Sequence, residues 1–214
     1  MKVLIHYLVK AVSVSLLLFC FFNQASANEG NPAQTKHQTT DTMSGSSQKV
    51  KKILASGKNP IVILETTAGN LELELYPKVA PKAVENFLEL VNRGYYDGIT
   101  FHRIIKGFMI QGGDPTGTGR GGESIFGGAF EDEIALGYAF DHGGILAMAN
   151  AGPNTNRSQF FITTGRASWL NGLHTIFGEL KNGFDVLTKL ESVRTDENNR
   201  PLQTERIIKA KILE

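Results

Sequence analysis

Short stretches of alternating apolar and polar residues, separated by glycine-rich turns, constrain this chain most strongly. Residues 71–75 read Leu-Glu-Leu-Glu-Leu, and residues 208–212 alternate isoleucine or alanine with lysine. A period of two puts successive side chains on opposite faces of a strand, so both segments predict strands with one buried face. Further apolar strands are expected at 61–64, 100–105, 108–112, 144–149, 159–163 and 175–180.

Only two segments carry a helical pattern in our reading. The first begins at Pro81, which suits the first helical turn, and ends at Arg93-Gly94. Its apolar side chains recur at intervals of three and four residues, at Val84, Phe87, Leu88 and Val91. A second helix is expected at 184–191. Many short strands with two helices favour a mainly β fold, a closed antiparallel barrel, over a doubly wound sheet.

The first 27 residues have the features of an export signal. Lys2 and Lys10 are followed by an apolar run at 11–22, and Ala25-Ser26-Ala27 supplies a cleavage motif. The run is shorter than the roughly 20 residues that a membrane-spanning helix needs. We therefore expect a signal peptide at 1–27 and an exported chain that is periplasmic in a two-membrane bacterium and otherwise secreted. The alternatives are a retained anchor and a lipid-modified N-terminus at Cys20.

The next segment, 28–50, contains mainly polar residues and almost no large apolar side chain. Such a composition cannot bury enough surface to offset the entropy of ordering, so we expect a disordered linker there. The folded domain is expected at 51–214, which is long enough for a sizeable core.

Charge and cysteine content exclude several classes of function. Removing Lys2 and Lys10 with the signal changes 22 basic and 21 acidic residues into 20 and 21, a net charge of −1. No basic excess is available to bind nucleic acid or an anionic membrane. Cys20 is the only cysteine, so the mature chain would contain no disulfide, zinc thiolate or cysteine nucleophile. No sequence motif indicates a metal site.

Two local motifs have a functional interpretation that we find weak. Gly117, Gly119 and Gly122 have the spacing of a dinucleotide-binding turn, but Gly127 and Gly128 would interrupt the helix that must follow it. A flexible glycine-rich loop explains them better. Ser158 has no flanking glycines of a nucleophile elbow, so hydrolysis is poorly supported.

Arg103 is a single charge among apolar residues. Alternation along the strand puts Phe101, Arg103 and Ile105 on one face. On the next strand the same rule puts Phe108 and Ile110 on one face, and Met109 and Gln111 on the other. Spacing alone favours an arginine at the rim that stacks on an aromatic ring over a functional cation.

Three long blocks then decide between these interpretations. FHRIIKGFMIQGGD (101–114), MANAGPNTNRSQFFIT (148–163) and WLNGLHTIFGEL (169–180) closely resemble the cyclophilin family of peptidyl-prolyl cis-trans isomerases. The resemblance implies a closed eight-stranded antiparallel β-barrel capped by two α-helices. It also implies an isomerase, here an exported bacterial-like member, that acts on proline-containing segments of unfolded or exported proteins without a cofactor or metal.

The resemblance assigns roles to individual positions. Arg103 matches the catalytic arginine. The proline pocket matches Phe108, Met109, Phe161, Leu170 and His174, and the peptide groove matches Gln111, Ala149, Asn150, Ala151, Gln159 and Trp169. The position of Trp169 further implies inhibition by cyclosporin. We expect a monomer. A proline-binding or chaperone module of the same fold is the alternative function.

Overall fold

A computed structural model describes residues 48–213 of the chain. The expected signal at 1–27 and nearly all of the expected linker lie outside the described residues. Residues 48–55 are helical and Val50 is buried, so the linker boundary expected at residue 50 falls inside a helix. The reason is that Val50, Ile53 and Leu54 recur at helical spacing and pack against the main core.

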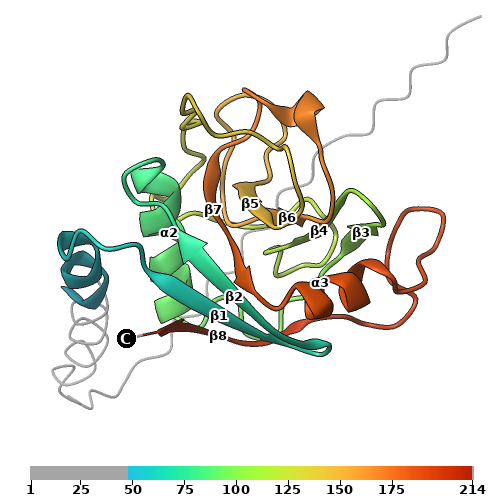
Figure 1. Cartoon of the computed structure of the whole chain (residues 1–214). Helices are drawn as coiled ribbons and strands as arrows, with labels where there is room; N and C mark the ends of the chain where they lie inside the picture. Colours follow the sequence, from blue (N-terminus) through green and yellow to red (C-terminus); the bar gives the residue numbers. More distant parts are fainter. Residues whose placement is uncertain (1–47, 214) are drawn as a thin grey trace, which may run out of the picture. The chain divides into compact units, whose positions relative to one another are not determined.

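Eight antiparallel strands form one sheet in the order β3-β4-β6-β5-β7-β2-β1-β8 (Figure 1). The strands are β1 Ile61–Thr66, β2 Gly69–Leu75, β3 Arg103–Ile105, β4 Met109–Gly112, β5 Ile145–Met148, β6 Phe160–Thr163, β7 Ile176–Asn182 and β8 Ile207–Leu213. Each strand overlaps a segment that was expected from the sequence. The prediction of a mainly β, eight-stranded antiparallel fold is confirmed.

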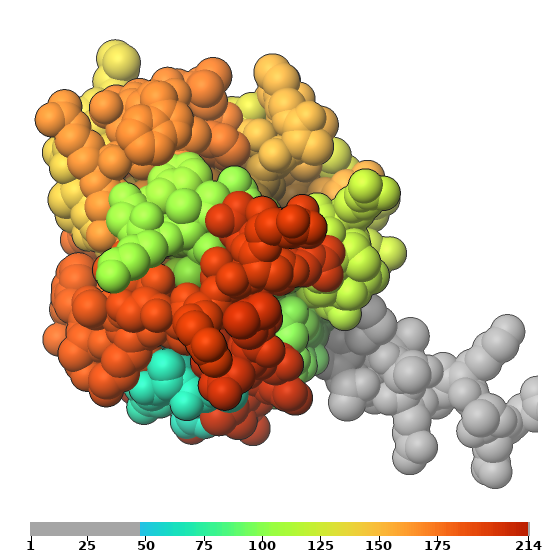
Figure 2. All heavy atoms as spheres, turned by 90° about the vertical axis from the view of Figure 1, so that its right-hand side faces the viewer, coloured from blue at the N-terminus to red at the C-terminus, as the bar shows by residue number. Residues whose placement is uncertain are grey.

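The prediction of a closed barrel was wrong: the sheet forms an open, curled half-barrel. Within residues 48–213 the edge strands β3 and β8 share no ladder, and the segments beside them meet at an isolated bridge between Thr100 and Arg206 with a few flanking backbone hydrogen bonds. The outer edge of β3 is already occupied, because the Ile104 amide donates to the Asn199 carbonyl over 2.9 Å. In Figure 2 this red segment before β8 lies directly against the green surface of β3 and β4.

Both expected helices are present. The first, α2, spans Pro81–Asn92, and the second, α3, spans Phe184–Glu191. A short 3-10 turn, η1, covers Ser168–Leu170. The helix α2 packs against β7 and β8, whereas α3 packs against β2, β3 and β4. No helix within residues 48–213 has the length and apolar content needed to cross a bilayer.

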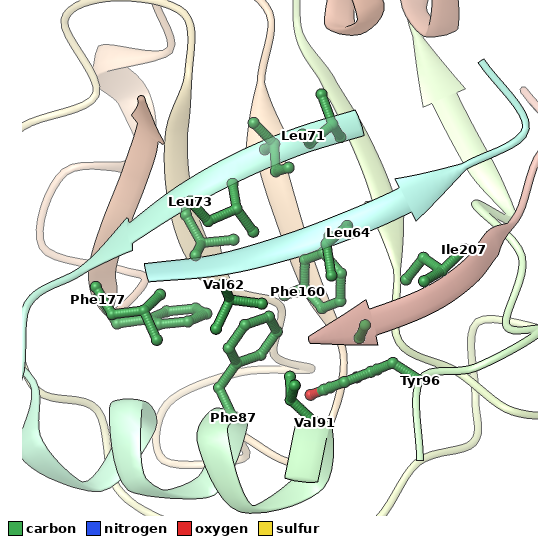
Figure 3. Close-up of a cluster of buried hydrophobic side chains, with 14 of the residues drawn as sticks. Val62, Leu64, Leu71, Leu73, Phe87, Val91, Tyr96, Phe160, Phe177 and Ile207 are labelled. Atoms are coloured by element: carbon green, nitrogen blue, oxygen red, sulfur yellow. The ribbon is translucent and has the colours of Figure 1, made fainter. Parts of the chain in front are cut away.

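The main core lies between α2 and the inner face of the sheet. Figure 3 shows Phe87 and Val91 of α2 pointing toward Val62 of β1, with Tyr96 beside them. Phe87 contacts Phe160 edge to face, with ring centroids 5.3 Å apart. Tyr96 is fully buried, and its hydroxyl donates to the Ser158 carbonyl over 2.9 Å. This aromatic packing attaches the segment before β6 to the helix.

Apolar side chains cover both faces of the central strands. Ile110 and Phe160 belong to the main core. Their neighbours Met109 and Phe161 point to the other face and form a second buried cluster, together with Phe140 and others. Successive residues of a strand face opposite ways, so one short strand can serve the core and a site at once. The second cluster is the floor of the candidate site.

Candidate functional site

Strand register brings the key residues into one row. Arg103 on β3 is opposite Gln111 on β4, which is opposite Phe161 on β6. Phe161 is in turn opposite Ala147 on β5, and Ala147 is opposite Ile176 on β7. Directly opposed residues in an antiparallel sheet have neighbouring side chains on the same face. A guanidinium, an amide and an aromatic ring therefore follow one another along the face of the sheet that carries the second cluster.

Two expectations about this face were wrong, both at strand ends. Phe101 does not share a face with Arg103, because β3 begins only at Arg103 and Phe101 is buried in the main core. Phe108 is not opposed to Met109, because it belongs to the turn before β4 and packs against the second cluster instead. Alternation applies only within a regular strand, and both residues lie outside one.

A cavity of about 290 Å³ lies over this row of residues. It is lined by Arg103, Phe108, Met109, Gln111, Ala149, Asn150, Phe161, Leu170 and His174. The structure thus brings nine of the twelve expected site residues around one hollow, including every residue expected in the proline pocket. Its floor is apolar and its rim carries a guanidinium and two amides. A small ring would fit the floor while a polar backbone meets the rim.

A chain of side-chain hydrogen bonds holds the polar rim. Arg103 Nη1 donates to Gln111 Oε1 over 3.4 Å, a long contact. Gln111 Nε2 donates to Gln159 Oε1 over 3.0 Å, and Gln159 Nε2 donates to the Gly121 carbonyl over 2.8 Å. Among residues 48–213, no carboxylate forms an ion pair with Arg103. Its guanidinium is therefore oriented but keeps donors for a ligand.

His174 and Asn150 use their side chains to hold the wall of the cavity. His174 Nδ1 lies 3.0 Å from the Met148 carbonyl, and its ring meets Phe161 edge to face at 5.4 Å. Asn150 Nδ2 donates to the Leu173 carbonyl over 2.9 Å and to Asp132 over 3.3 Å. The NH₂ group of the Asn150 carboxamide is therefore already used within the protein.

The three remaining expected residues lie beside this cavity. Ala151 and Gln159 line a neighbouring hollow of about 440 Å³, which shares Gln111, Ala149 and Asn150 with the first. Trp169 is 61 % exposed and lies outside the lining of both, although its ring contacts that of Phe108 at 5.4 Å. The expected groove is therefore two adjoining hollows with an exposed indole nearby.

The glycine-rich loop is organised by the buried Asp114. One carboxylate oxygen accepts from the amide and hydroxyl of Thr116, each over 2.8 Å. The other accepts from the amides of Gly119 over 2.6 Å and Gly121 over 3.2 Å. A Cβ at Gly121 would lie 2.3 Å from the carboxylate, so only glycine allows this approach. The glycines therefore wrap the chain around an internal acid.

These contacts shift the titration of Asp114. Burial by itself would raise the pKa of the carboxyl group, but hydrogen bonds from Thr116, Gly121 and Gly119 outweigh it and lower the pKa to about 2. Asp114 therefore stays charged under all ordinary conditions. The carbonyl of Gly121, which accepts from Gln159, is placed by this same carboxylate.

Several residues around the site carried no sequence signal. Arg120 and Arg157 line the second hollow, and Thr118 and Arg200 line a further hollow together with Arg103. His102 is 8 % exposed and neither ring nitrogen has a hydrogen-bond partner in the described part of the chain. Burial lowers its pKa, Asp114 opposes this shift, and Arg200 and Arg103 reinforce it. These residues occupy loops or strand ends, where no periodicity marks them.

The arrangement suits non-covalent chemistry. The described residues contain no cluster of His, Cys, Asp and Glu side chains able to hold a metal ion. Ser158 is fully buried and its hydroxyl donates to the Gly113 carbonyl over 2.7 Å, so its role in this region is structural. What remains is an apolar hollow, a fixed guanidinium and several amides.

Comparison with known proteins identifies relatives of most of the folded region. Residues 61–212 match the family model described as cyclophilin type peptidyl-prolyl cis-trans isomerase/CLD. Human peptidyl-prolyl cis-trans isomerase-like 1 is 56 % identical over 155 residues, covering 72 % of this chain and 93 % of its own. The protein of the same name from Gibberella zeae is 56 % identical over 153 residues, covering 72 % and 94 %.

Solved structures give the same result. A crystal structure of a cyclophilin type isomerase from Cryptosporidium parvum has a TM-score of 0.72 and 47 % identity, covering 73 % of this chain and 98 % of its own. The same protein in the presence of the dipeptide Ala-Pro gives 0.71 and 48 %, covering 72 % and 99 %. The relatives named here are eukaryotic, so they do not support the expected likeness to exported bacterial members.

Proposed function

Since this chain belongs to the cyclophilin type peptidyl-prolyl cis-trans isomerase family and is such an isomerase, we propose that Arg103 stabilises the twisted X-Pro bond in its transition state. The observation that carries the proposal is the cross-strand row of Arg103, Gln111 and Phe161. A guanidinium that keeps donors for a ligand, next to an apolar floor, supports a proline ring as the ligand. The crystal structure of the Cryptosporidium relative with Ala-Pro supports a proline ligand of this kind.

The reaction needs no bond to be made or broken except the partial double bond of the imide. Rotation about X-Pro crosses a barrier of about 18 to 20 kcal/mol because amide resonance is lost. In the twisted state the proline nitrogen regains a lone pair, which accepts a hydrogen bond far better than the planar imide does. A guanidinium donor at that nitrogen therefore binds the transition state more strongly than the ground state.

The remaining residues of the cavity hold the two ends of the rotating bond. Met109, Phe161 and Leu170 enclose the proline ring and exclude water, which otherwise stabilises the polar resonance form of the planar imide. Gln111 and the Asn150 backbone hold the residue before the proline. With the ring fixed, the carbonyl of that residue turns past Arg103.

The test is kinetic. Line-shape or exchange NMR on a proline tetrapeptide gives kcat and KM without a coupling protease, for the chain from Asn28 and for variants at Arg103. An isomerase dependent on this guanidinium loses kcat when Arg103 changes. A module that only binds proline motifs would bind the peptide while its exchange rate stays at the uncatalysed value in every variant.

We also propose that the chain is exported and acts on proline-containing segments of unfolded or exported proteins. Support comes from the charged, apolar and Ala-Ser-Ala regions of residues 1–27, which precede the matched region. In a two-membrane bacterial host that expresses the full chain, mass spectrometry of the periplasmic fraction should find Asn28 as the first residue. A protein retained in the cytoplasm, or one that begins at a lipid-modified Cys20, would contradict this.

A further part of the proposal is competitive inhibition by cyclosporin, with Trp169 in contact with the drug. The indole is 61 % exposed beside Phe108, so it offers a large apolar face and one N–H donor at the rim. Trp169→Phe keeps an apolar ring but removes the donor and some contact area, and we expect the inhibition constant to rise roughly ten- to thirtyfold.

The measurements are inhibition kinetics for both proteins and indole fluorescence during titration of the wild type with the drug. Because Trp169 is mostly exposed, its replacement should leave the melting temperature unchanged. Trp169 would not belong to the drug site if the inhibition constant were unchanged in Trp169→Phe and the indole fluorescence of the wild type did not change when cyclosporin is added.

A further inference from the structure

A third hollow adjoins the proline cavity at Arg103. It has a volume of about 620 Å³ and is lined by His102, Arg103, Gln111, Thr118, Gly119, Asn150, Asn198 and Arg200. It shares Arg103, Gln111 and Asn150 with the proline cavity, so the two meet at the catalytic arginine. Unlike the proline cavity, it has no aromatic or aliphatic floor.

A loop closed by hydrogen bonds holds Arg200 in this hollow. Asp196 accepts the amides of Asn198 over 2.8 Å and Arg200 over 2.9 Å, and Thr195 pairs with Pro201 across the loop. The Asn199 carbonyl accepts from Ile104, the residue after Arg103. The loop is thereby fixed to the edge of β3, as Figure 2 shows for the red segment against the green one.

The Arg200 side chain extends from this loop across the hollow. Its Nη2 donates to the Thr118 carbonyl over 3.5 Å, on the glycine-rich loop that Asp114 organises. The contact is long and exposed, so it orients the guanidinium without using up its five donors. Arg103 on strand β3 and Arg200 on the loop before β8 thus line the same hollow.

The charged side chains that line this hollow are both positive. Two guanidinium groups line it, and no carboxylate does. Within residues 48–213 neither arginine has an ion-pair partner. Glu205 lines the adjoining hollow next to Arg200, but its carboxylate accepts a hydrogen bond from the Thr67 hydroxyl. An anionic side chain entering here would gain an arginine partner without displacing one.

From these contacts we infer that Arg200 selects substrates that carry an acidic side chain directly after the proline. The inference rests on the proposed function, because it takes the proline ring to lie over Phe161 with its nitrogen at Arg103. The chain before the proline then lies along Ala149, Asn150 and Gln159, toward the second hollow. We take the chain after the proline to pass Arg103 into the hollow that Arg200 lines, because this hollow shares Arg103 with the proline cavity and the second hollow does not.

The experiment compares kcat/KM for short peptides that differ only at the residue after proline, Glu, Gln or Lys, measured by exchange NMR at low salt. The wild type should prefer Glu over Gln about fivefold, and added salt should reduce the preference because the pair is partly exposed. Arg200→Gln should abolish the preference, Arg200→Lys should retain part of it, and Arg200→Glu should turn it toward Lys.

The matched control is Arg157→Gln, which removes a guanidinium from the second hollow, on the side before the proline. It should keep the preference for Glu after the proline if the effect is local to Arg200. An equal loss in Arg157→Gln would mean that net charge, and not Arg200, sets the preference. A second peptide pair with Glu or Gln before the proline tests direction, and an Arg200-dependent preference there would overturn the assignment.

Failure of the inference is distinct from failure of the proposed function. Turnover that depends on Arg103 but is equal for Glu, Gln and Lys peptides would overturn the inference alone. Turnover that survives the loss of Arg103 would overturn the mechanism on which the inference rests. Melting temperatures of all variants show whether a lost preference reflects a lost fold.

Discussion

Arg103→Ala is expected to lower kcat about 10²-fold, the usual cost of removing one preorganised donor at developing charge. The alanine variant keeps the apolar floor, so it should still bind proline peptides. What it loses is the donor that meets the imide nitrogen only in the twisted state. The loss should therefore appear in kcat with little change in KM.

Two further variants separate charge from geometry. Arg103→Lys keeps a cation but loses the planar fork that Gln111 orients, so it should recover only part of the rate. Lys106→Ala removes an exposed cation three residues away that does not line the cavity, and it should behave as wild type. If Arg103→Ala and Lys106→Ala turn over peptide equally fast with folds intact by circular dichroism, Arg103 has no part in catalysis.

Asp114→Ala is expected to lower the free energy of unfolding by about 3 kcal/mol, because it leaves several loop amides without an acceptor. The carboxylate holds the amides of Thr116, Gly119 and Gly121. Asp114→Asn is the sharper variant, since it preserves shape but turns an NH₂ group toward one set of these donors. Urea unfolding should show a loss of stability in both variants, and isomerase activity should fall as the Gly121 contact to Gln159 loosens.

The same carboxylate makes stability depend on pH. Its pKa is about 2 in the folded protein against 3.8 in an unfolded chain, so the folded state binds the proton less readily. Its contribution is therefore complete above pH 3.8 and is lost as the pH falls toward 2, an effect of about 2 kcal/mol. The stability gap between wild type and Asp114→Asn should narrow from pH 5 to pH 2.5. A constant gap would show that the carboxylate charge is not what holds the loop.

Local patterns in the sequence were sufficient for most of the secondary structure. The leucines of 71–75 are fully buried in β2 while the glutamates between them are not, as a period of two requires. Pro81 and the apolar spacing after it predicted α2. The second helix was predicted at 184–191, and α3 has these bounds. These features depend on residues a few positions apart, so each is determined by one short segment of the chain.

The errors occurred where a regular element ends. Phe101 and Phe108 lie just outside β3 and β4, where the chain bends and alternation no longer assigns a face. The helix at 48–55 is short, and its apolar residues find their partners only in the distant core. The half-barrel stays open because the loop at Asn199 occupies the edge of β3, a pairing between segments far apart in sequence.

The sequence by itself determined the family, through three blocks of matching residues, and the residue types of the candidate site. Only the tertiary structure decided how those residues act together. The register of β3, β4 and β6 sets Arg103 beside Gln111 and Phe161, and the loop on the β3 edge brings Arg200 to the same place. Register and loop docking depend on hydrogen bonds between distant segments, which no local period in the chain encodes.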